Sequence, residues 1–195
     1  MTRDALRRQM RATRRALPPE TRRLASIAAA VRLADSPRYR SARRIAVYVA
    51  MDGELDPTPF VMRARSDGRE LYLPVLPQGE GPMSFLPYAQ DAALTPNRFG
   101  IPEPAADPAR VRPGTDMDLV LTPLVAFDLF GNRIGMGAGF YDRTFAFLKD
   151  TTRSQSPLIG YAYECQKVDA IDPQAWDVSL AGVATEQQFY AFSRT

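Results

Sequence analysis

The sequence predicts an α/β fold in which helices cover a mostly parallel β-sheet. The clearest sign is a strand, a helix and a second strand in succession between residues 44 and 76, which is the spacing of two parallel strands joined by a crossover helix. The length of 195 residues suits one domain, and neither an internal repeat nor a low-complexity linker divides the chain. We therefore expect residues 1–195 to form a single domain.

The first predicted helix runs from the N-cap residue Thr2 to about residue 17, where Pro18 and Pro19 end it. Its apolar side chains recur at spacings of four and seven and form a stripe that packs inward: Leu6, Met10 and Leu17. A neighbouring stripe is basic: Arg3, Arg7, Arg11 and Arg14.

A second helix is predicted over residues 20–34. Its apolar residues follow the i, i+3, i+4, i+7 pattern, which predicts these side chains on the buried face: Leu24, Ile27, Ala28 and Val31. Residues 44–50 (RIAVYVA) then form a short buried strand, and Asp52 and Gly53 form a turn.

The third helix begins at Pro57-Thr58-Pro59 and ends at Gly68, and the next strand covers residues 70–76. Ten of the seventeen prolines lie between Pro74 and Pro123, so we expect residues 77–117 to be mostly loop, with one strand near 83–88.

Residues 118–127 are the strongest candidate for a buried strand. A helix over 140–149 and strands over 158–162 and 182–185 complete the predicted elements, and we expect residues 189–192 to pack locally.

Composition excludes several kinds of chemistry. The chain has no histidine and one cysteine, Cys165, which excludes a Ser-His-Asp triad, a histidine zinc site, an internal disulfide and a Cys-x-x-Cys motif. The available groups are carboxylates, arginines, hydroxyls and backbone amides, which favours magnesium and phosphate chemistry. Since the longest apolar stretch is too short for a membrane span and no signal-peptide core is present, we expect a cytoplasmic protein with no membrane partner.

Charge is distributed unevenly. Residues 1–44 hold thirteen arginines and three acids, a net charge of +10, whereas the remaining residues have a net charge of −7. An arginine-rich segment of this kind suits nucleic acid, an anionic ligand or simply a solvated helix face; its core positions argue against a removable targeting peptide.

A glycine-rich loop carries the clearest chemical signal. Gly135, Gly137 and Gly139 alternate just before a predicted helix, so their backbone amides can approach an anion closely. Arg133 can add a charge-assisted contact, and Asp142 can hold a magnesium ion. The loop matches neither a P-loop nor a dinucleotide fingerprint, so a plain turn between strand and helix is the alternative.

The wider motifs extend this interpretation. The string LTPLVAFDLFGNRIGMGAGFYDR, together with RDALRRQMRATRRAL, YVAMDGELD, NRFGIPEP, GYAYECQ and WDVSLAGVATE, resembles the 5-formyltetrahydrofolate cyclo-ligase family nearly from end to end. The resemblance implies a three-layer α/β/α fold. It also implies conversion of 5-formyltetrahydrofolate to 5,10-methenyltetrahydrofolate with ATP and Mg²⁺, through a phosphorylated formyl (imidate) intermediate, with release of ADP and phosphate.

The resemblance also implies the site residues. The ATP-binding residues are Arg3, Asp4, Ala5, Leu6, Arg7, Arg133, Ile134, Gly135, Met136, Gly137, Ala138, Gly139, Phe140 and Tyr141. Arg3 stands where the family usually has lysine, and some members carry Arg and Lys in place of Met136 and Ala138.

The folate-binding residues that the resemblance implies are Val49, Met51, Glu54, Met136, Gly137, Ala138, Gly139 and Phe140. Arg133 and Tyr141 are the implied catalytic residues, and Asp142 and Asp177 the implied magnesium ligands. Glu54 can accept two hydrogen bonds from the N–C–N edge of a pterin.

Several residues have plainer interpretations. Asp177 and Asp128 suit turns, Glu54 a solvated turn, and Tyr141 a core aromatic at a helix start. We expect Cys165 to be a small buried hydrophobe and Trp176 a packing residue, and Arg11 and Arg14 suit plain surface charge.

Two other functions stay open. One is a nucleic-acid-binding module that uses the arginine-rich helices, and the other is a relative that keeps the nucleotide site but acts on another acceptor. The segment 1–38 has no aromatic residue and no recognition motif, so we expect a monomeric enzyme with a folate and ATP as ligands and no nucleic-acid partner.

Overall fold

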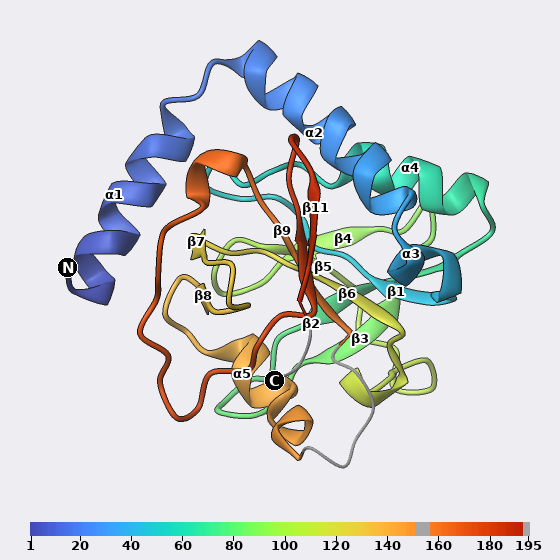
Figure 1. The fold of residues 1–195 in the computed structure, drawn as a ribbon. Helices are drawn as coiled ribbons and strands as arrows, with labels where there is room; N and C mark the ends of the chain where they lie inside the picture. Colours follow the sequence, from blue (N-terminus) through green and yellow to red (C-terminus); the bar gives the residue numbers. More distant parts are fainter. Residues whose placement is uncertain (151–156, 193–195) are drawn as a thin grey trace.

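The computed structural model describes residues 1–150 and 157–192, and within them the chain builds a seven-stranded sheet with the order β11-β10-β9-β6-β1-β2-β3 (Figure 1). The five inner strands are all parallel, and the two edge strands β3 and β11 pair antiparallel with their neighbours. The strands are β1 (Arg44–Ala46), β2 (Glu70–Val75), β3 (Ser84–Pro87), β6 (Leu119–Thr122), β9 (Leu158–Tyr161), β10 (Gly182–Ala184) and β11 (Phe189–Ala191). The predicted mostly parallel sheet is confirmed.

Helices cover both faces of the sheet, as the three-layer prediction requires. The helices are α1 (Arg3–Arg15), α2 (Pro19–Ala34), α3 (Pro37–Ser41), α4 (Thr58–Ser66) and α5 (Phe140–Thr144). Successive strand residues point to opposite faces: Ile45 and Leu71 pack with α2, α3 and α4, whereas Ala46 and Tyr72 pack with Phe145 and Leu148 behind α5. Figure 1 shows the same division, with α2 and α4 together on one side and α5 on the other. No helix in the described residues is both long and apolar enough to cross a membrane.

Local signals account for the helix boundaries near the N-terminus. The hydroxyl of Thr2 accepts a hydrogen bond from the amide of Ala5 at 3.2 Å and so caps α1 as predicted. The predicted β1-α4-β2 unit is confirmed too: Asp56 binds the Thr58 amide at the start of α4, and Gly68 follows it with φ of +69°.

The predicted buried face of α2 is wrong. Leu24, Ile27 and Val31 are 52%, 43% and 54% exposed, and Ala28 is only partly buried. The helix turns its small residues inward instead, where they share a core cluster with α4: Ala25, Ala29, Ala30, Leu33 and Ala34. Both faces satisfy a helical period, and the alanine face allows closer approach of the backbones.

We expect the same substitution to have different effects on the two faces of α2. Leu33→Ala should lower the free energy of unfolding by about 2–5 kcal/mol, because it opens a cavity in the core. Leu24→Ala should change it by no more than about 0.5 kcal/mol. Denaturant titration measures both values; a loss at Leu24 as large as that at Leu33 would contradict the orientation of α2.

Proline breaks the strand predicted over residues 118–127. β6 ends at Thr122, Pro123 follows, and Ala126–Phe127 forms β7, which pairs with β8 (Arg133–Ile134) in a separate two-stranded sheet. Since proline donates no backbone hydrogen bond, it ends the ladder there. The predicted strand 44–50 is likewise shorter: β1 covers Arg44–Ala46, and the amide of Val47 makes one more hydrogen bond, to the Tyr72 carbonyl, at 2.9 Å.

Other elements depart from prediction in length or were not predicted. The region 77–117 contains a hairpin of β4 (Leu94–Pro96) and β5 (Pro102–Pro104) in addition to β3, and a 3₁₀ turn at Gly114–Asp116. The predicted helix 140–149 is α5 followed by a 3₁₀ turn at Ala146–Lys149, and a further 3₁₀ turn covers Glu164–Gln166. The tail 189–192 packs locally as expected, with Phe189–Ala191 as the edge strand β11.

Candidate active site

A cavity of about 560 Å³ lies at the carboxyl ends of β1, β2 and β6. The chain that follows each strand contributes to its wall, through Tyr48 after β1, Leu76 after β2 and Pro123 after β6. Open parallel sheets bind ligands at this edge. The wall is completed by α1, the glycine loop and the β4–β5 hairpin, so segments far apart in the sequence share one chamber.

α1 presents three arginines of its predicted basic stripe to this cavity: Arg3, Arg7 and Arg11. Arg3 Nη1 lies 2.8 Å from Asp177 Oδ2, and Arg7 Nε donates to the Gly135 carbonyl at 2.9 Å. The adjacent stripe of Leu6 and Met10 packs in a small apolar cluster with Ile134. The helix is thus held to the body of the protein and directs its charges into the cavity.

The glycine loop runs from β8 to α5 and lines the cavity from Gly135 to Tyr141. Gly137 and Gly139 have φ of +108° and +67°, a conformation that favours glycine, whereas Gly135 has no positive φ. α5 has only five residues, so the positive helix end contributes less than the sequence suggested, and the loop amides and nearby arginines provide most of the attraction for an anion.

Arg133 and Asp142 form one rigid unit under the loop. Arg133 is buried, donates to the Val178 carbonyl, and lies 2.7 Å from Asp142 Oδ1 through Nη2. The same carboxylate oxygen accepts the Val178 amide at 3.0 Å. These bonds fix both side chains where they line the cavity.

Glu54 also lines the cavity and lies directly after the Asp52-Gly53 turn. Its side chain is largely buried, and Oε2 accepts a hydrogen bond from the Met51 amide at 3.0 Å. Burial raises the pKa of Glu54, and the Met51 amide and Arg14 act in the opposite direction. The plain interpretation of Glu54 as a solvated turn acid is therefore wrong.

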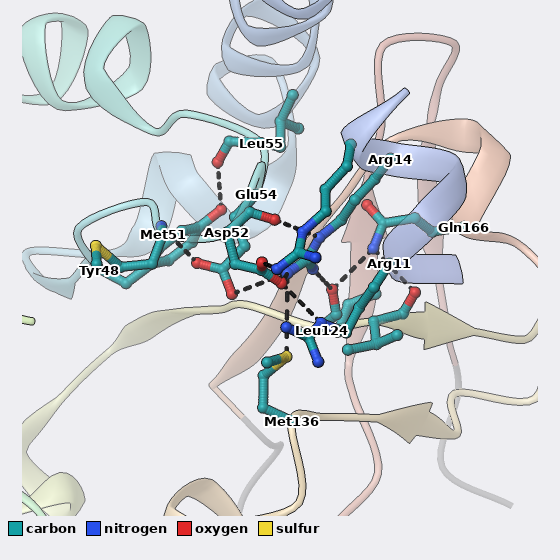
Figure 2. Close-up of polar contacts among 12 residues, drawn as sticks. Arg11, Arg14, Tyr48, Met51, Asp52, Glu54, Leu55, Leu124, Met136 and Gln166 are labelled. Carbon is teal, nitrogen blue, oxygen red and sulfur yellow. Dashed lines mark hydrogen bonds and ion pairs between the residues drawn. The ribbon is translucent and has the colours of Figure 1, made fainter. Parts of the chain in front are cut away.

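The interpretation of Arg14 as plain surface charge is wrong. Arg14 is fully buried and donates to the carbonyl oxygens of Asp52 and Leu124, each at 3.1 Å, and to Asp52 Oδ2 at 2.9 Å (Figure 2). Arg11 shares that Asp52 oxygen at 2.8 Å, and Gln166 donates to the Leu124 carbonyl at 2.8 Å. Burial lowers the pKa of Arg14, and Glu54 opposes this effect.

The site therefore combines a basic, glycine-lined end and a carboxylate end within one cavity. Comparison with known proteins agrees with that arrangement: the sequence model of the 5-formyltetrahydrofolate cyclo-ligase family matches residues 1–186. The chain belongs to the 5-formyltetrahydrofolate cyclo-ligase family.

Individual relatives support the assignment. The 5-formyltetrahydrofolate cyclo-ligase of Escherichia coli (strain K12) is 39% identical over 182 residues, which cover 93% of this chain and 98% of that protein. The one from Haemophilus influenzae is 40% identical over 142 residues, covering 72% and 74%. The NMR structure of Aquifex aeolicus 5,10-methenyltetrahydrofolate synthetase superimposes with a TM-score of 0.82 at 30% identity, covering 100% of this chain and 95% of that one. The protein is therefore an enzyme, a cyclo-ligase.

Most residues implied for the cyclo-ligase site line the cavity. On the folate side these are Val49, Met51 and Glu54; on the nucleotide side they are Arg3, Arg7, Arg133, Asp142, Asp177 and the loop residues Gly135, Met136, Gly137, Ala138, Gly139, Phe140 and Tyr141. Four others do not line it: Asp4 pairs with Arg7 on the exposed side of α1, Ala5 is partly buried beside it, and Leu6 and Ile134 pack in the apolar cluster.

Asp142 and Asp177 have the chemistry that a magnesium ion requires. Each carboxylate uses one oxygen for an arginine and a backbone amide, Asp177 accepting the Gln174 amide at 2.9 Å. In residues 1–150 and 157–192 the other oxygen of each, Asp142 Oδ2 and Asp177 Oδ1, makes no hydrogen bond. Hard carboxylate oxygens of this kind suit Mg²⁺, which commonly takes one or two carboxylates together with phosphate and water.

Tyr141 lies in the cavity wall at the start of α5. Burial and the nearby Glu54 raise its pKa well above the ordinary tyrosine value, whereas Arg133 acts in the opposite direction. The hydroxyl group therefore stays protonated at neutral pH and can donate a hydrogen bond to a ligand.

The sequence interpretation missed part of the apolar wall. Phe99, at the tip of the β4–β5 hairpin, meets Phe140 edge to face with 6.0 Å between ring centroids, and Ile101 and Met83 lie nearby in the wall. Glu103 Oε1 accepts the Leu76 amide at 2.9 Å and so attaches the hairpin to β2. The motif NRFGIPEP was recognised, but its side chains were not placed in the cavity because the hairpin was not predicted.

Three plain interpretations have different outcomes. Trp176 lines the cavity and is 64% exposed, so the expectation that it is a packing residue is wrong. Cys165 is exposed on the 3₁₀ turn before Gln166 and is not the buried hydrophobe expected. Asp128 is confirmed as a turn former: its carboxylate accepts the amides of Phe130 and Asn132.

Proposed function

We propose that the cavity catalyses the cyclisation of 5-formyltetrahydrofolate to 5,10-methenyltetrahydrofolate with consumption of ATP and release of ADP and phosphate, with Mg²⁺ as the metal. The observation that carries this proposal is that one continuous cavity joins an arginine and glycine wall, suited to phosphates, to a buried carboxylate, suited to a pterin. Both substrates can therefore bind side by side in the same cavity.

The basic end is assigned to ATP. Arg3, Arg7 and Arg133 surround it, and the glycine loop can direct backbone amides at the phosphates. Met136 and Ala138 bring no charge where some family members have Arg and Lys, so these three arginines provide most of the charge neutralisation.

Asp142 and Asp177 are the residues that would hold Mg²⁺. When bound there, the ion neutralises phosphate charge during phosphoryl transfer. Each carboxylate is oriented by an arginine, Arg133 for Asp142 and Arg3 for Asp177, so the metal ligands and the phosphate-binding cations are fixed by the same contacts.

The carboxylate end is assigned to the folate. Glu54 can accept the two hydrogen-bond donors of the pterin N–C–N edge, while Val49 and Met51 contact the ring system and Met136–Phe140 of the glycine loop faces it from the nucleotide side. In this arrangement the formyl group points from the Glu54 wall toward Arg133 and Tyr141.

The chemistry follows in two stages. The formyl oxygen attacks the γ-phosphorus of ATP, the bond to ADP breaks, and the oxygen becomes part of a phosphorylated imidate. N10 then attacks the formyl carbon and loses its proton, and the carbon–oxygen bond breaks so that phosphate leaves. Arg133 is placed to stabilise the negative charge on the phosphoryl group, and protonated Tyr141 can donate to an oxygen of the same group. Phosphoryl transfer of this kind depends on positioning and charge neutralisation, which agrees with the lack of histidine in the chain.

An ultraviolet assay tests the proposal. The complete mixture of protein, 5-formyltetrahydrofolate, ATP and Mg²⁺ should develop methenyltetrahydrofolate absorbance, and mixtures without ATP or without metal should not. If the band is absent while ATP still binds in a titration, the phosphate site stands but the folate is not its acceptor. Absence of both would contradict the proposal.

We also expect the enzyme to act as a cytoplasmic monomer without a nucleic-acid partner. The expected lack of a nucleic-acid partner is supported by four of the six arginines of α1: Arg3, Arg7, Arg11 and Arg14 all have partners within the protein, so most of the positive charge of this helix is already paired. A filter-binding experiment with RNA and DNA at low salt checks this expectation, and salt-dependent binding that is lost on neutralising α1 would contradict it.

A further inference from the structure

We propose that Arg14 is a positioning residue for substrate binding: its buried guanidinium group connects α1, the Asp52-Gly53 turn and the chain after β6, and holds Glu54 as an oriented carboxylate. This inference rests on the proposed function, since it concerns how Glu54 binds the folate. Arg14 itself does not line the cavity, so its role is exerted through its neighbours.

The geometry places Arg14 at the meeting point of three segments. Nε donates to the Asp52 carbonyl, Nη1 to the Leu124 carbonyl, and Nη2 to Asp52 Oδ2, with Glu54 Oε1 at 3.8 Å from the same Nη2 (Figure 2). The Leu124 carbonyl lies just beyond the break at Pro123, where the strand ladder has ended. One side chain thereby sets the distance between the nucleotide-side helix and the folate-side turn.

Attaching a helix through a buried charge requires that the charge lose its hydration. Removing a guanidinium group from water carries a large desolvation penalty, and an apolar side chain of similar size often serves stability equally well. α1 already uses Leu6 and Met10 for apolar attachment. The presence of Arg14 on the same helix therefore indicates a role that depends on its charge.

The carboxylate of Asp52 alone does not balance the positive charge of Arg14. Arg11, Arg14 and Arg15 all pair with the Asp52 carboxylate, so three positive charges meet one negative charge. Asp52 itself has φ of +54°, an uncommon conformation for a residue other than glycine, which turns the chain so that Glu54 follows directly beside Arg14. The excess positive charge favours the ionised form of Glu54.

The other groups around Glu54 provide no second cation at this range. Tyr48 after β1 and Tyr141 of α5 interact with Glu54, and burial raises the pKa of both hydroxyl groups, so both stay neutral at physiological pH. Tyr163 contributes only a hydrogen bond to the Glu54 carbonyl, at 3.4 Å. Within the described part of the chain, Arg14 is thus the cation that Glu54 approaches within 4 Å.

Steady-state kinetics of three variants tests the proposal. Arg14→Met keeps an unbranched apolar stem but removes the guanidinium group and its charge; it should raise the KM for 5-formyltetrahydrofolate at least about tenfold, because a buried charge loses its partner. The KM for ATP should change by less than about threefold. Arg14→Lys should recover part of the loss. Arg15→Met is the matched control, since it removes a half-exposed charge that pairs with the same Asp52 carboxylate; because solvent screens this charge, both KM values should change by less than about threefold.

The pH profile separates positioning from general damage. In Arg14→Met, the rise in folate KM on acidification should begin at higher pH than in the wild type, because protonation of Glu54 is no longer opposed. Asp52→Asn should shift the profile the other way, since it leaves more of the Arg14 charge to Glu54; asparagine also tolerates a positive φ. This variant keeps the proposal testable if Arg14→Met does not fold.

The outcomes are distinct from those of the assay for the proposed function. Wild-type protein without turnover would contradict the proposed function. Active wild-type protein whose Arg14→Met variant keeps its folate KM and pH profile, or whose two KM values rise together, would overturn the role of Arg14 alone.

Discussion

Glu54→Gln is expected to raise the KM for 5-formyltetrahydrofolate by about 10- to 150-fold, since hydrogen bonds to a charged group contribute about 1.5–3 kcal/mol. The amide keeps the shape of the side chain but presents one acceptor oxygen to the pterin where the carboxylate presents two. The KM for ATP should stay close to the wild-type value, because the phosphates are assigned to Arg3, Arg7 and Arg133 and not to Glu54.

Asp56→Asn is the matched control for this variant. Asp56 is an exposed acid two residues away, where it accepts a hydrogen bond from the Thr58 amide at 2.9 Å and does not line the cavity. Steady-state kinetics with each substrate varied in turn measures both variants. An unchanged folate KM in Glu54→Gln, or an equal rise in Asp56→Asn, would contradict the assignment of Glu54 to the pterin.

The direction of the Glu54 pKa shift also predicts how Glu54→Gln changes thermal stability. Burial raises the pKa of Glu54 in the folded protein, so ionising this group favours the unfolded chain. The protonated form of Glu54 therefore favours the folded protein. This contribution to stability is fully present at pH values below the pKa of Glu54 in the unfolded chain, and it is lost as the pH rises through the raised pKa of Glu54 in the folded protein. Glu54→Gln should therefore raise Tm at neutral pH while it weakens folate binding, and the gain should vanish in acid.

Asp142→Asn is expected to lower kcat by about 100- to 1000-fold, the range seen when one preorganised electrostatic group is removed from an active site. The substitution weakens two interactions. One is the ion pair of Asp142 with Arg133, whose atoms lie 2.7 Å apart, and the other is the binding of Mg²⁺ assigned to the second carboxylate oxygen. Raising the Mg²⁺ concentration should restore part of the activity, because the loss includes weaker metal binding.

Asp116→Asn provides the comparison for a carboxylate paired with an arginine away from the cavity. Asp116 lies 3.7 Å from Arg112, outside the cavity wall, and its substitution should leave kcat unchanged. Initial rates measured over a magnesium titration distinguish the variants. A magnesium dependence in Asp142→Asn identical to that of the wild type would contradict the metal assignment, and equal losses of ATP affinity in the Asp142 and Glu54 variants would contradict the division of the cavity into two ends.

Local signals in the sequence were sufficient for much of the fold. Thr2 as a cap, prolines at the start of α4 and Gly68 after it each act over a few residues, so the β1-α4-β2 unit could be predicted from them. Positions set by tertiary contacts could not. Leu24 and Leu33 both lie on plausible helical stripes, and only the close packing of the alanine face of α2 with α4 decides between them.

The same limit applies to the site. The glycine loop and Glu54 belong to motifs that can be recognised along the chain, and the structure brings both into one cavity. Arg14 and Phe99 also lie in recognised motifs, RDALRRQMRATRRAL and NRFGIPEP, but the sequence does not indicate what their side chains contact. An arginine on a basic helix has the pattern of solvated charge until Asp52 and Leu124 are placed beside it, and Phe99 reaches the cavity through a hairpin that a proline-rich segment conceals.

The attachment of α1 has a consequence for the conditions in which the enzyme works. Two apolar side chains, Leu6 and Met10, and several arginine contacts hold this helix to the body of the protein. Residues 1–44 carry a net charge of +10 and the rest −7, so dissolved ions screen part of the attraction between the two, while the interior of the sheet is insensitive to them. We therefore expect high ionic strength to weaken the partly exposed ion pairs of α1 before it unfolds the sheet. Because residues of α1 line the cavity, we expect catalysis to be lost at a lower salt concentration than the fold.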